Sequence, residues 1–281
     1  MSPRTRHYSG TVLRTALASL VLLSAAAVSA KERALHTQLQ TAPEDALPAL
    51  LERMTSTKLD APSRNAAASA VAKLLDQGHG DAVTDRALET LGALGAPGAG
   101  PILSQYTQHR RPEARARAFA ALGRVAGSDR GLRELVANGL RDSVPEVRAA
   151  SARALEVLRA REATPLLLRA LGRGVPEAAV TLGAIGEPSS LEAYSAYLRK
   201  QPLDVMLSGY ERYLQRSDLS EESKLDIVAR LEDVAGPAVL RFLSAVAGRP
   251  QLPAAVKQAA SAAALRVAKA EQQRTAAEGK P

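Results

Sequence analysis

Apolar residues recur every three or four positions through most of the chain, which is the spacing of one face of an α-helix. The pattern also repeats on a larger scale, in DAVTDRALETLGALG from Asp81, PEARARAFAALGRVAG from Pro112 and PEVRAASARALEVLRA from Pro145. The leucine that closes the shared pattern returns after 31 and then 33 residues. A shorter fourth copy, PEAAVTLGAIG, starts at Pro176. This period predicts stacked units that bury their apolar faces against one another.

Each unit has the pattern of two helices joined by a short turn. In the copy from Pro145, the proline suits the first turn of a helix, and Ser143 with Glu146 matches a capping box. A second apolar helix begins at Thr164. No stretch shows a convincing strand, so the fold is expected to be all-α. The predicted organisation is a signal peptide over 1–30, an N-terminal capping helix region over 31–60, repeats over 61–201, further helix pairs and a C-terminal cap over 202–265, and a frayed polar tail over 266–281.

The best copy also resembles a known family. DSVPEVRAA from Asp142, followed by ATPLL from Ala163, is similar to a HEAT repeat of the short type found in bilin lyases and many bacterial repeat proteins. The resemblance implies an α-solenoid, a superhelix of antiparallel helix pairs, whose usual role is to scaffold protein–protein interactions. It also implies that Asp142 and Arg148 brace successive units through hydrogen bonds. The other units depart from this spacing: the copy from Pro112 has His109 in place of the acid, and the copy from Pro176 has Ala179 in place of the arginine.

The N-terminus has the pattern of an export signal. Three arginines precede an apolar run from Thr15 to Ala27, and Val28-Ser29-Ala30 provides small residues for cleavage after Ala30. The uncharged stretch of 16 residues is short for a membrane span, which needs about 20. We therefore expect a periplasmic or secreted protein with no membrane span after cleavage. An uncleaved signal anchor is the alternative.

Composition then limits the chemistry that this chain can perform. It has 281 residues and no Cys, which excludes disulfides and thiolate-bound metals. Its four His lie far apart, and none of the common catalytic motifs is present. Aromatic residues make up only 3% of the chain, which disfavours a β-sandwich or barrel. We expect no catalytic residues, no metal and no cofactor, so the protein is expected not to be an enzyme.

Positive charge is concentrated in the middle of the chain. The formal net charge is +8, and residues 110–173 contain 14 Arg against 7 acidic residues. One interpretation is an electropositive stripe that binds an acidic partner, such as a polyanionic polysaccharide, lipid head groups or an acidic protein. The other is an ordinary solvated face. Two arginines on predicted second helices, Arg133 and Arg169, are candidate interaction residues. Nucleic acid is not expected as a partner, because the chain is expected to be exported and no aromatic residues interleave the arginines.

Four of the six tyrosines form a local cluster. Tyr194 and Tyr197 are three residues apart, as are Tyr210 and Tyr213, so each pair shares a helix face. Tyrosine is enriched in binding hot spots, which makes the cluster a candidate interaction surface. Ordinary packing between adjacent helices, with the hydroxyls at the rim, is the alternative.

Together these features predict an exported, non-catalytic HEAT-like scaffold that binds protein partners in the cell envelope. The second helix of each unit would line its concave side. The alternative function is polyanion binding by the central arginines. The sequence identifies neither the partner nor the oligomeric state.

Overall fold

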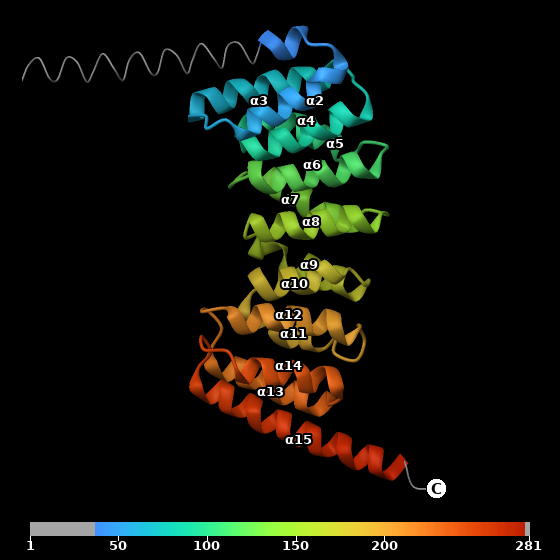
Figure 1. Cartoon of the computed structure of the whole chain (residues 1–281), viewed down its shortest axis with the longest axis vertical. Coiled ribbons are helices and arrows are strands. Elements are labelled where there is room, and N and C mark those ends of the chain that lie inside the picture. Colours follow the sequence, from blue (N-terminus) through green and yellow to red (C-terminus); the bar gives the residue numbers. More distant parts are fainter. Residues whose placement is uncertain (1–36, 279–281) are drawn as a thin grey trace, which may run out of the picture. The chain divides into compact units, whose positions relative to one another are not determined.

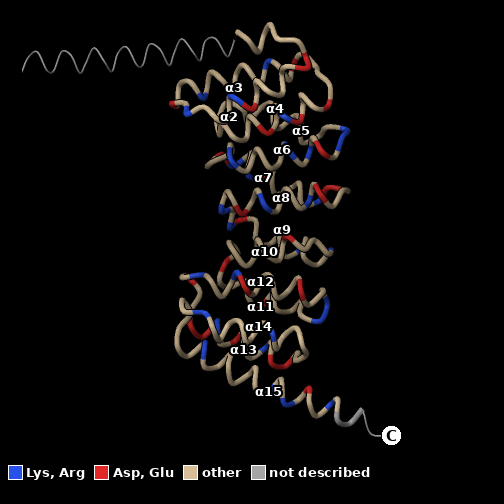
Figure 2. The backbone as a smooth tube through the Cα atoms, viewed as in Figure 1, with Lys and Arg blue, Asp and Glu red and all other residues tan. Residues whose placement is uncertain are grey.

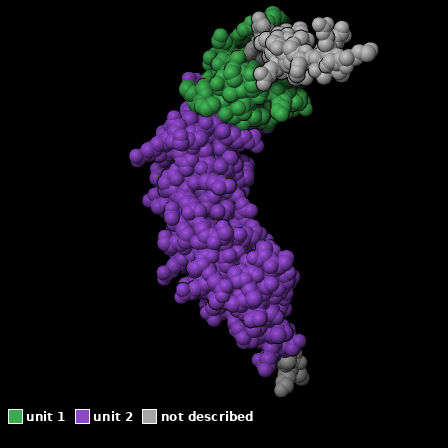
Figure 3. Space-filling model, turned by 90° about the vertical axis from the view of Figure 1, so that its left-hand side faces the viewer, with its two compact units in different colours: residues 1–102 green, residues 103–281 purple. Residues whose placement is uncertain are grey.

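The structure is a computed structural model that describes residues 37–278, and all regular secondary structure within that range is helical (Figure 1). The all-α prediction is therefore confirmed. The chain divides into two compact units, residues 1–102 and 103–281, which are described separately below (Figure 3). This boundary falls inside the segment predicted as repeats, 61–201. The predicted signal peptide at 1–30 lies outside the described residues.

The first unit is built on three helices: α2 (Leu47–Ser56), α3 (Ala61–Asp76) and α4 (Asp81–Leu94). Both α2 and α3 pack on α4. The α3 helix begins after Asp60, whose carboxylate accepts a hydrogen bond of 2.9 Å from the Ser63 amide. Leu91, the leucine of the first repeat copy, is fully buried here. A short turn then leads into α5 (Gly100–Tyr106), which crosses the boundary between the units.

The second unit is a stack of helix pairs (Figure 1). Its helices are α6 (Pro112–Val125), α7 (Arg130–Asn138), α8 (Pro145–Val157), α9 (Thr164–Gly172), α10 (Pro176–Ile185), α11 (Leu191–Ser195), α12 (Leu203–Gln215), α13 (Glu221–Val234), α14 (Pro237–Ala247) and α15 (Ala254–Glu278). The first helices of successive pairs pack in series, α6 on α8, α8 on α10 and α10 on α12. This arrangement is the predicted α-solenoid.

The repeated sequence positions hold the stack together. Pro112, Pro145 and Pro176 each open a helix, where the missing proline N–H costs nothing. The leucines that close the pattern are fully buried in this unit at positions 122, 155 and 182. The prediction of a capping box at Ser143 and Glu146 is wrong. Val144 is the N-cap residue of α8, and Ser143 makes no cap hydrogen bond. The Asp142 carboxylate instead accepts a hydrogen bond of 2.9 Å from the Val144 amide.

Two glycines allow α10 and α12 to pack closely. A methyl group on Gly183 would lie 2.7 Å from the Arg212 Cβ, and one on Gly209 would lie 2.7 Å from the Ala179 carbonyl oxygen. Both distances are well below a van der Waals contact. The sequence pattern predicted the helices, but not this backbone-to-backbone approach.

The sequence pattern indicates an Ala-rich helix over 253–275, and α15 spans Ala254–Glu278. This helix also covers most of the segment expected as a frayed polar tail, 266–281. Val256, Ala260, Ala263 and Val267 are buried along it. None of the helices in 37–278 combines the length and apolar character that crossing a membrane requires.

Candidate functional site

Arg133 braces two successive units through its guanidinium group. Its Nε and Nη2 atoms donate to the two carboxylate oxygens of Glu162, at 2.6 and 3.2 Å. Its Nη1 atom donates to the carbonyl oxygens of Gly127 and Leu158, both at 3.0 Å. The hydrogen bond from Arg133 lowers the pKa of the Glu162 carboxyl, and partial burial only partly opposes this. With 18% of its side chain exposed, Arg133 positions the loops rather than offering a free charge to a partner.

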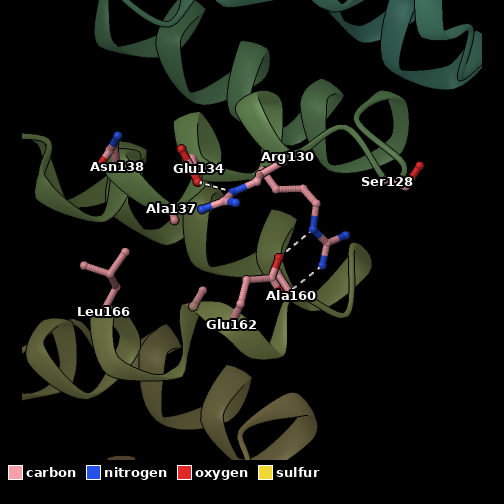
Figure 4. Close-up of a pocket in the computed structure, with 10 residues that line it drawn as sticks. Ser128, Arg130, Glu134, Ala137, Asn138, Ala160, Glu162 and Leu166 are labelled. Atoms are coloured by element: carbon pink, nitrogen blue, oxygen red, sulfur yellow. Dashed lines mark hydrogen bonds and ion pairs between the residues drawn. The ribbon is translucent and has the colours of Figure 1, made fainter.

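A groove opens beside this brace, between α7 and the following second helix, α9 (Figure 4). Its cavity volume is about 620 Å³. Its lining comprises three alanines and a leucine with charged and polar neighbours: Ser128, Arg130, Arg133, Glu134, Ala137, Asn138, Ala160, Glu162, Ala163 and Leu166. Arg130 Nε lies 2.8 Å from Glu134 Oε1, and Arg133 pairs with Glu162. Each arginine of the groove is therefore neutralised by a glutamate. An apolar centre with a balanced polar rim is typical of protein–protein interfaces.

Arg169 remains a candidate, because its side chain is exposed on α9 and has no ion-pair partner in the described part of the chain. Five other central arginines share this property, namely Arg110, Arg124, Arg141, Arg159 and Arg173. Figure 2 shows the basic residues distributed over several layers of the second unit. The arginine-rich segment therefore consists of two populations, one committed to structure and one accessible.

Asp142 and Arg148 differ from the arrangement that the family resemblance implies. The Asp142 carboxylate accepts two hydrogen bonds of 2.8 Å from Arg115, which belongs to the preceding unit. Arg148 donates instead to the carbonyl oxygens of Asp142 and Ser143 in its own unit, both at 2.9 Å. Partial burial raises the pKa of Asp142, but the hydrogen bonds from Arg115 and the Val144 amide outweigh it and lower the pKa overall.

This contact is not repeated in the next unit. Arg148 occupies the position of Arg115, but Arg173 stands where the next unit would need an acid. Within residues 37–278, the Arg148 guanidinium donates hydrogen bonds only to backbone carbonyl oxygens, and its charge also helps to lower the pKa of Asp142. The sequence pattern does not reveal the Arg115–Asp142 pair, because the two residues are 27 positions apart. Their contact can be recognised only once the alignment of successive helix pairs in the stack is known.

The tyrosine cluster is part of the core, which corrects the expectation of an interaction surface. Tyr194, Tyr210 and Tyr213 are 0% exposed, and Tyr194 contacts the other two rings edge-on, with centroids 5.0 and 5.3 Å apart. The Tyr194 hydroxyl donates to the Met206 carbonyl oxygen at 2.7 Å. The Tyr210 hydroxyl donates to Ser195 Oγ at 2.9 Å.

The hydroxyls are buried rather than placed at the rim. The Tyr213 hydroxyl lies 3.1 Å from Ser190 Oγ, so all three find partners inside the protein. Burial raises the pKa of all three phenols. Tyr197 alone is partly accessible, and its ring lies against Gly172. These tyrosines join α11 to α12 and leave little surface for a partner.

No group of three or more His, Asp or Glu side chains among residues 37–278 is arranged to hold a metal ion.

Comparison with known proteins supports this architecture. Residues 71–156 match the family model of HEAT repeats. The class of protein is thus an α-solenoid, and residues 71–156 of the chain are similar to HEAT repeats. No curated protein sequence matches the chain.

Several solved structures are similar to it. Human deoxyhypusine hydroxylase in complex with glycerol is 18% identical, with 88% of this chain and 99% of that chain covered and a TM-score of 0.40. An engineered protein from a structural genomics consortium is 15% identical, covering 85% and 97%, with a TM-score of 0.39. A designed armadillo repeat protein is 15% identical, covering 83% and 98%, with a TM-score of 0.41.

Proposed function

We propose that the protein is an exported, non-catalytic scaffold that binds protein partners in the cell envelope. The observation that carries this proposal is the α7–α9 groove, whose alanine and leucine floor is bordered by two balanced ion pairs. HEAT repeats commonly act as interaction scaffolds, which supports protein as the class of partner. The N-terminal pattern of residues 1–30 supports export.

A site-specific crosslinking experiment tests the scaffold. A photoreactive amino acid is placed at Asn138, which is exposed at the edge of the groove, and the native envelope is irradiated. A matched control carries the same amino acid at Ser244, an exposed position on α14. We expect protease-sensitive adducts of defined mass from Asn138 and none from Ser244. Absence of adducts at Asn138, or identical adducts at both positions, contradicts a protein-binding role for this groove.

Export is tested separately. Cell fractionation and N-terminal sequencing should find the mature chain outside the cytoplasm and beginning at Lys31. A full-length chain retained in the cytoplasmic fraction contradicts export, and a full-length chain in the membrane supports the uncleaved anchor.

The six exposed, unpaired arginines favour polyanion binding as the second candidate function. Binding to a polysaccharide or to anionic vesicles would then collapse between low and moderate salt, because screening weakens exposed charge pairs. A complex with a protein that survives the same change of salt favours the scaffold.

A further inference from the structure

A second groove lies on the first-helix face of the second unit, where α10 is flanked by two longer helices. α10 has 10 residues, whereas α8 and α12 have 13 each. The partly exposed side chains of α10 include Val180 and Ala184, which are short and uncharged. On either side, Arg153 of α8 and Arg212 of α12 are long and charged. This difference in side-chain length leaves a depression over α10.

The depression over the end of α10 has a volume of about 670 Å³. Its lining consists of Arg153, Glu156, Val157, Arg159, Arg161, Ala184, Ile185 and Arg212. Arg212 reaches across α10 and forms an ion pair with Glu156 of α8. A second depression, of about 360 Å³, shares Arg153 and continues past Arg148 to the start of α8. The two depressions together follow α8 along its length.

The charges in this groove are not balanced. The two depressions are lined by five arginines and three glutamates, Glu146, Glu156 and Glu177, and a fourth acid just outside the lining, Asp218, forms an ion pair with Arg161. Arg159 has no ion-pair partner in the described chain, and Arg148 contacts only backbone oxygens. Arg153 Nη1 lies 3.6 Å from Glu177 Oε1, and 63% of the Arg153 side chain is exposed. Exposed pairs of this kind contribute little stability, so Arg153 can exchange its partner for another carboxylate.

The groove also offers an apolar contact. Val157 is 61% exposed, which makes it one of two large apolar side chains that the described residues leave open to solvent. It borders the same depression as Ala184 and Ile185. A purely charged ligand would gain nothing from the exposed Val157 side chain, whereas a ligand with one apolar side chain among its acids would bury it.

We propose that the groove over α10, between α8 and α12, binds an acidic peptide segment of a partner protein through an apolar residue flanked by carboxylates. The apolar residue would cover Val157, and the carboxylates would bind Arg153 and Arg159. This inference rests on the proposed scaffold function and names the chemistry of a partner. α8 is about 20 Å long, so an extended segment of about six residues spans the groove.

The test uses fluorescence anisotropy with a labelled synthetic peptide of that length, containing Glu residues around a central Leu. We expect the Arg153→Glu/Arg159→Glu protein to bind it about tenfold more weakly or worse, because two attractive pairs become repulsive. Arg169→Glu is the control for charge reversal outside the groove, since it reverses one exposed, unpaired arginine on α9, and should bind within about twofold of the parent. A peptide with Ser in place of Leu should bind more weakly to the parent.

Two further measurements keep the result interpretable. Circular dichroism and urea unfolding establish that the double variant is folded. If the double variant does not fold, Arg159→Gln is used instead, because the Arg159 side chain makes no ion pair on which the fold depends. A loss of peptide affinity in Arg159→Gln supports binding in the groove. Unchanged peptide binding in a folded variant overturns it.

Competing ligands distinguish the remaining outcomes. Equal affinity for the Leu and Ser peptides, together with tighter binding of polyphosphate or heparin, overturns the proposal in favour of a general polyanion site. No peptide binding combined with persistent adducts at Asn138 overturns this groove and leaves the scaffold function standing. If neither peptide binding nor adducts are found, both proposals fail.

Discussion

Replacement of Gly209 by alanine should disrupt the contact between α10, α11 and α12. In the structure, an added methyl group would meet the Tyr194 hydroxyl oxygen first, and would lie 2.6 Å from the Tyr194 Cζ atom and 2.7 Å from the Ala179 carbonyl oxygen. The Tyr194 ring is fully buried and its hydroxyl is held by the Met206 carbonyl oxygen. Because one obstacle is backbone and the other is a fixed ring, the methyl group cannot be accommodated by a simple rotamer change.

The magnitude follows from two costs and one gain. Overpacking a core by one methyl group costs about 1–3 kcal/mol. Displacement of the Tyr194 ring also breaks a buried hydrogen bond, which costs about 1–3 kcal/mol. The higher helix propensity of alanine returns about 1 kcal/mol. We therefore expect Gly209→Ala to lower the free energy of unfolding by about 3 kcal/mol, as the balance of these terms.

Urea unfolding followed by circular dichroism measures the loss, and hydrogen exchange locates it. The increase in exchange should centre on α10–α12, because each unit of a repeat protein contacts only its neighbours. Gly248→Ala is the matched control, since the nearest atom to its added methyl group is 3.7 Å away, and it should change stability by less than about 0.5 kcal/mol.

A double-mutant cycle tests the steric reasoning directly. Tyr194→Phe removes the oxygen that the new methyl group meets first, so it should destabilise the parent but cost less in the Gly209→Ala background. Equal costs in the two backgrounds, or a Gly209→Ala variant as stable as Gly248→Ala, would refute the reasoning.

Three further predictions concern the braces and the backbone. Asp142→Asn should lower stability at pH 7 by about 1–2 kcal/mol, and its difference from the parent should narrow below about pH 4. The sign follows because the folded-state pKa of Asp142 is lowered, so its contribution is present above its unfolded pKa and disappears as pH falls through the folded value; urea titrations at both pH values check this. Arg133→Ala should cost about 1–3 kcal/mol by leaving Glu162 and two loop carbonyls without their donor, and hydrogen exchange should increase in the loops after α6 and α8. Ala235→Gly should stabilise the protein by about 1 kcal/mol, because Ala235 has φ of 54° and ψ of −166°, a region that glycine alone adopts easily; an unchanged or lower unfolding midpoint would contradict it.

The helix pairs could be predicted from sequence because the need to bury apolar side chains determines both the spacing of these residues along the chain and the packing of the helices. Leucine positions 122, 155 and 182 must be buried to stabilise the units, and burial at helical spacing is what the pattern records. The helix that follows Pro176 is correspondingly short in both the sequence pattern and the structure. Local spacing and apolar burial therefore account for most of the fold.

The tyrosines show where such reasoning fails. A spacing of three residues places Tyr210 and Tyr213 on one helix face but does not reveal whether that face meets solvent or another helix. The answer depends on Gly209, which lets the Tyr194 ring lie against α12, and on Ser190 and Ser195, which accept or share the hydroxyl protons. These contacts involve a five-residue helix, α11, that was not delimited by the periodicity.

The arginines lead to a different conclusion, because composition suggested one stripe where the structure has several roles. Arg115 and Arg133 each bind a carboxylate of the following unit and are committed to the stack. Arg148 is in the position to continue the first of these braces, but the corresponding position of the next unit is Arg173 and not an acid. The interruption coincides with the short helix α10, so the stack loses an internal salt bridge at the place where its surface is hollowed. This repeat lacks the internal salt bridge of the preceding one and has accessible positive charge in its place. It is therefore a better candidate for recognition than the arginine-rich segment taken as a whole.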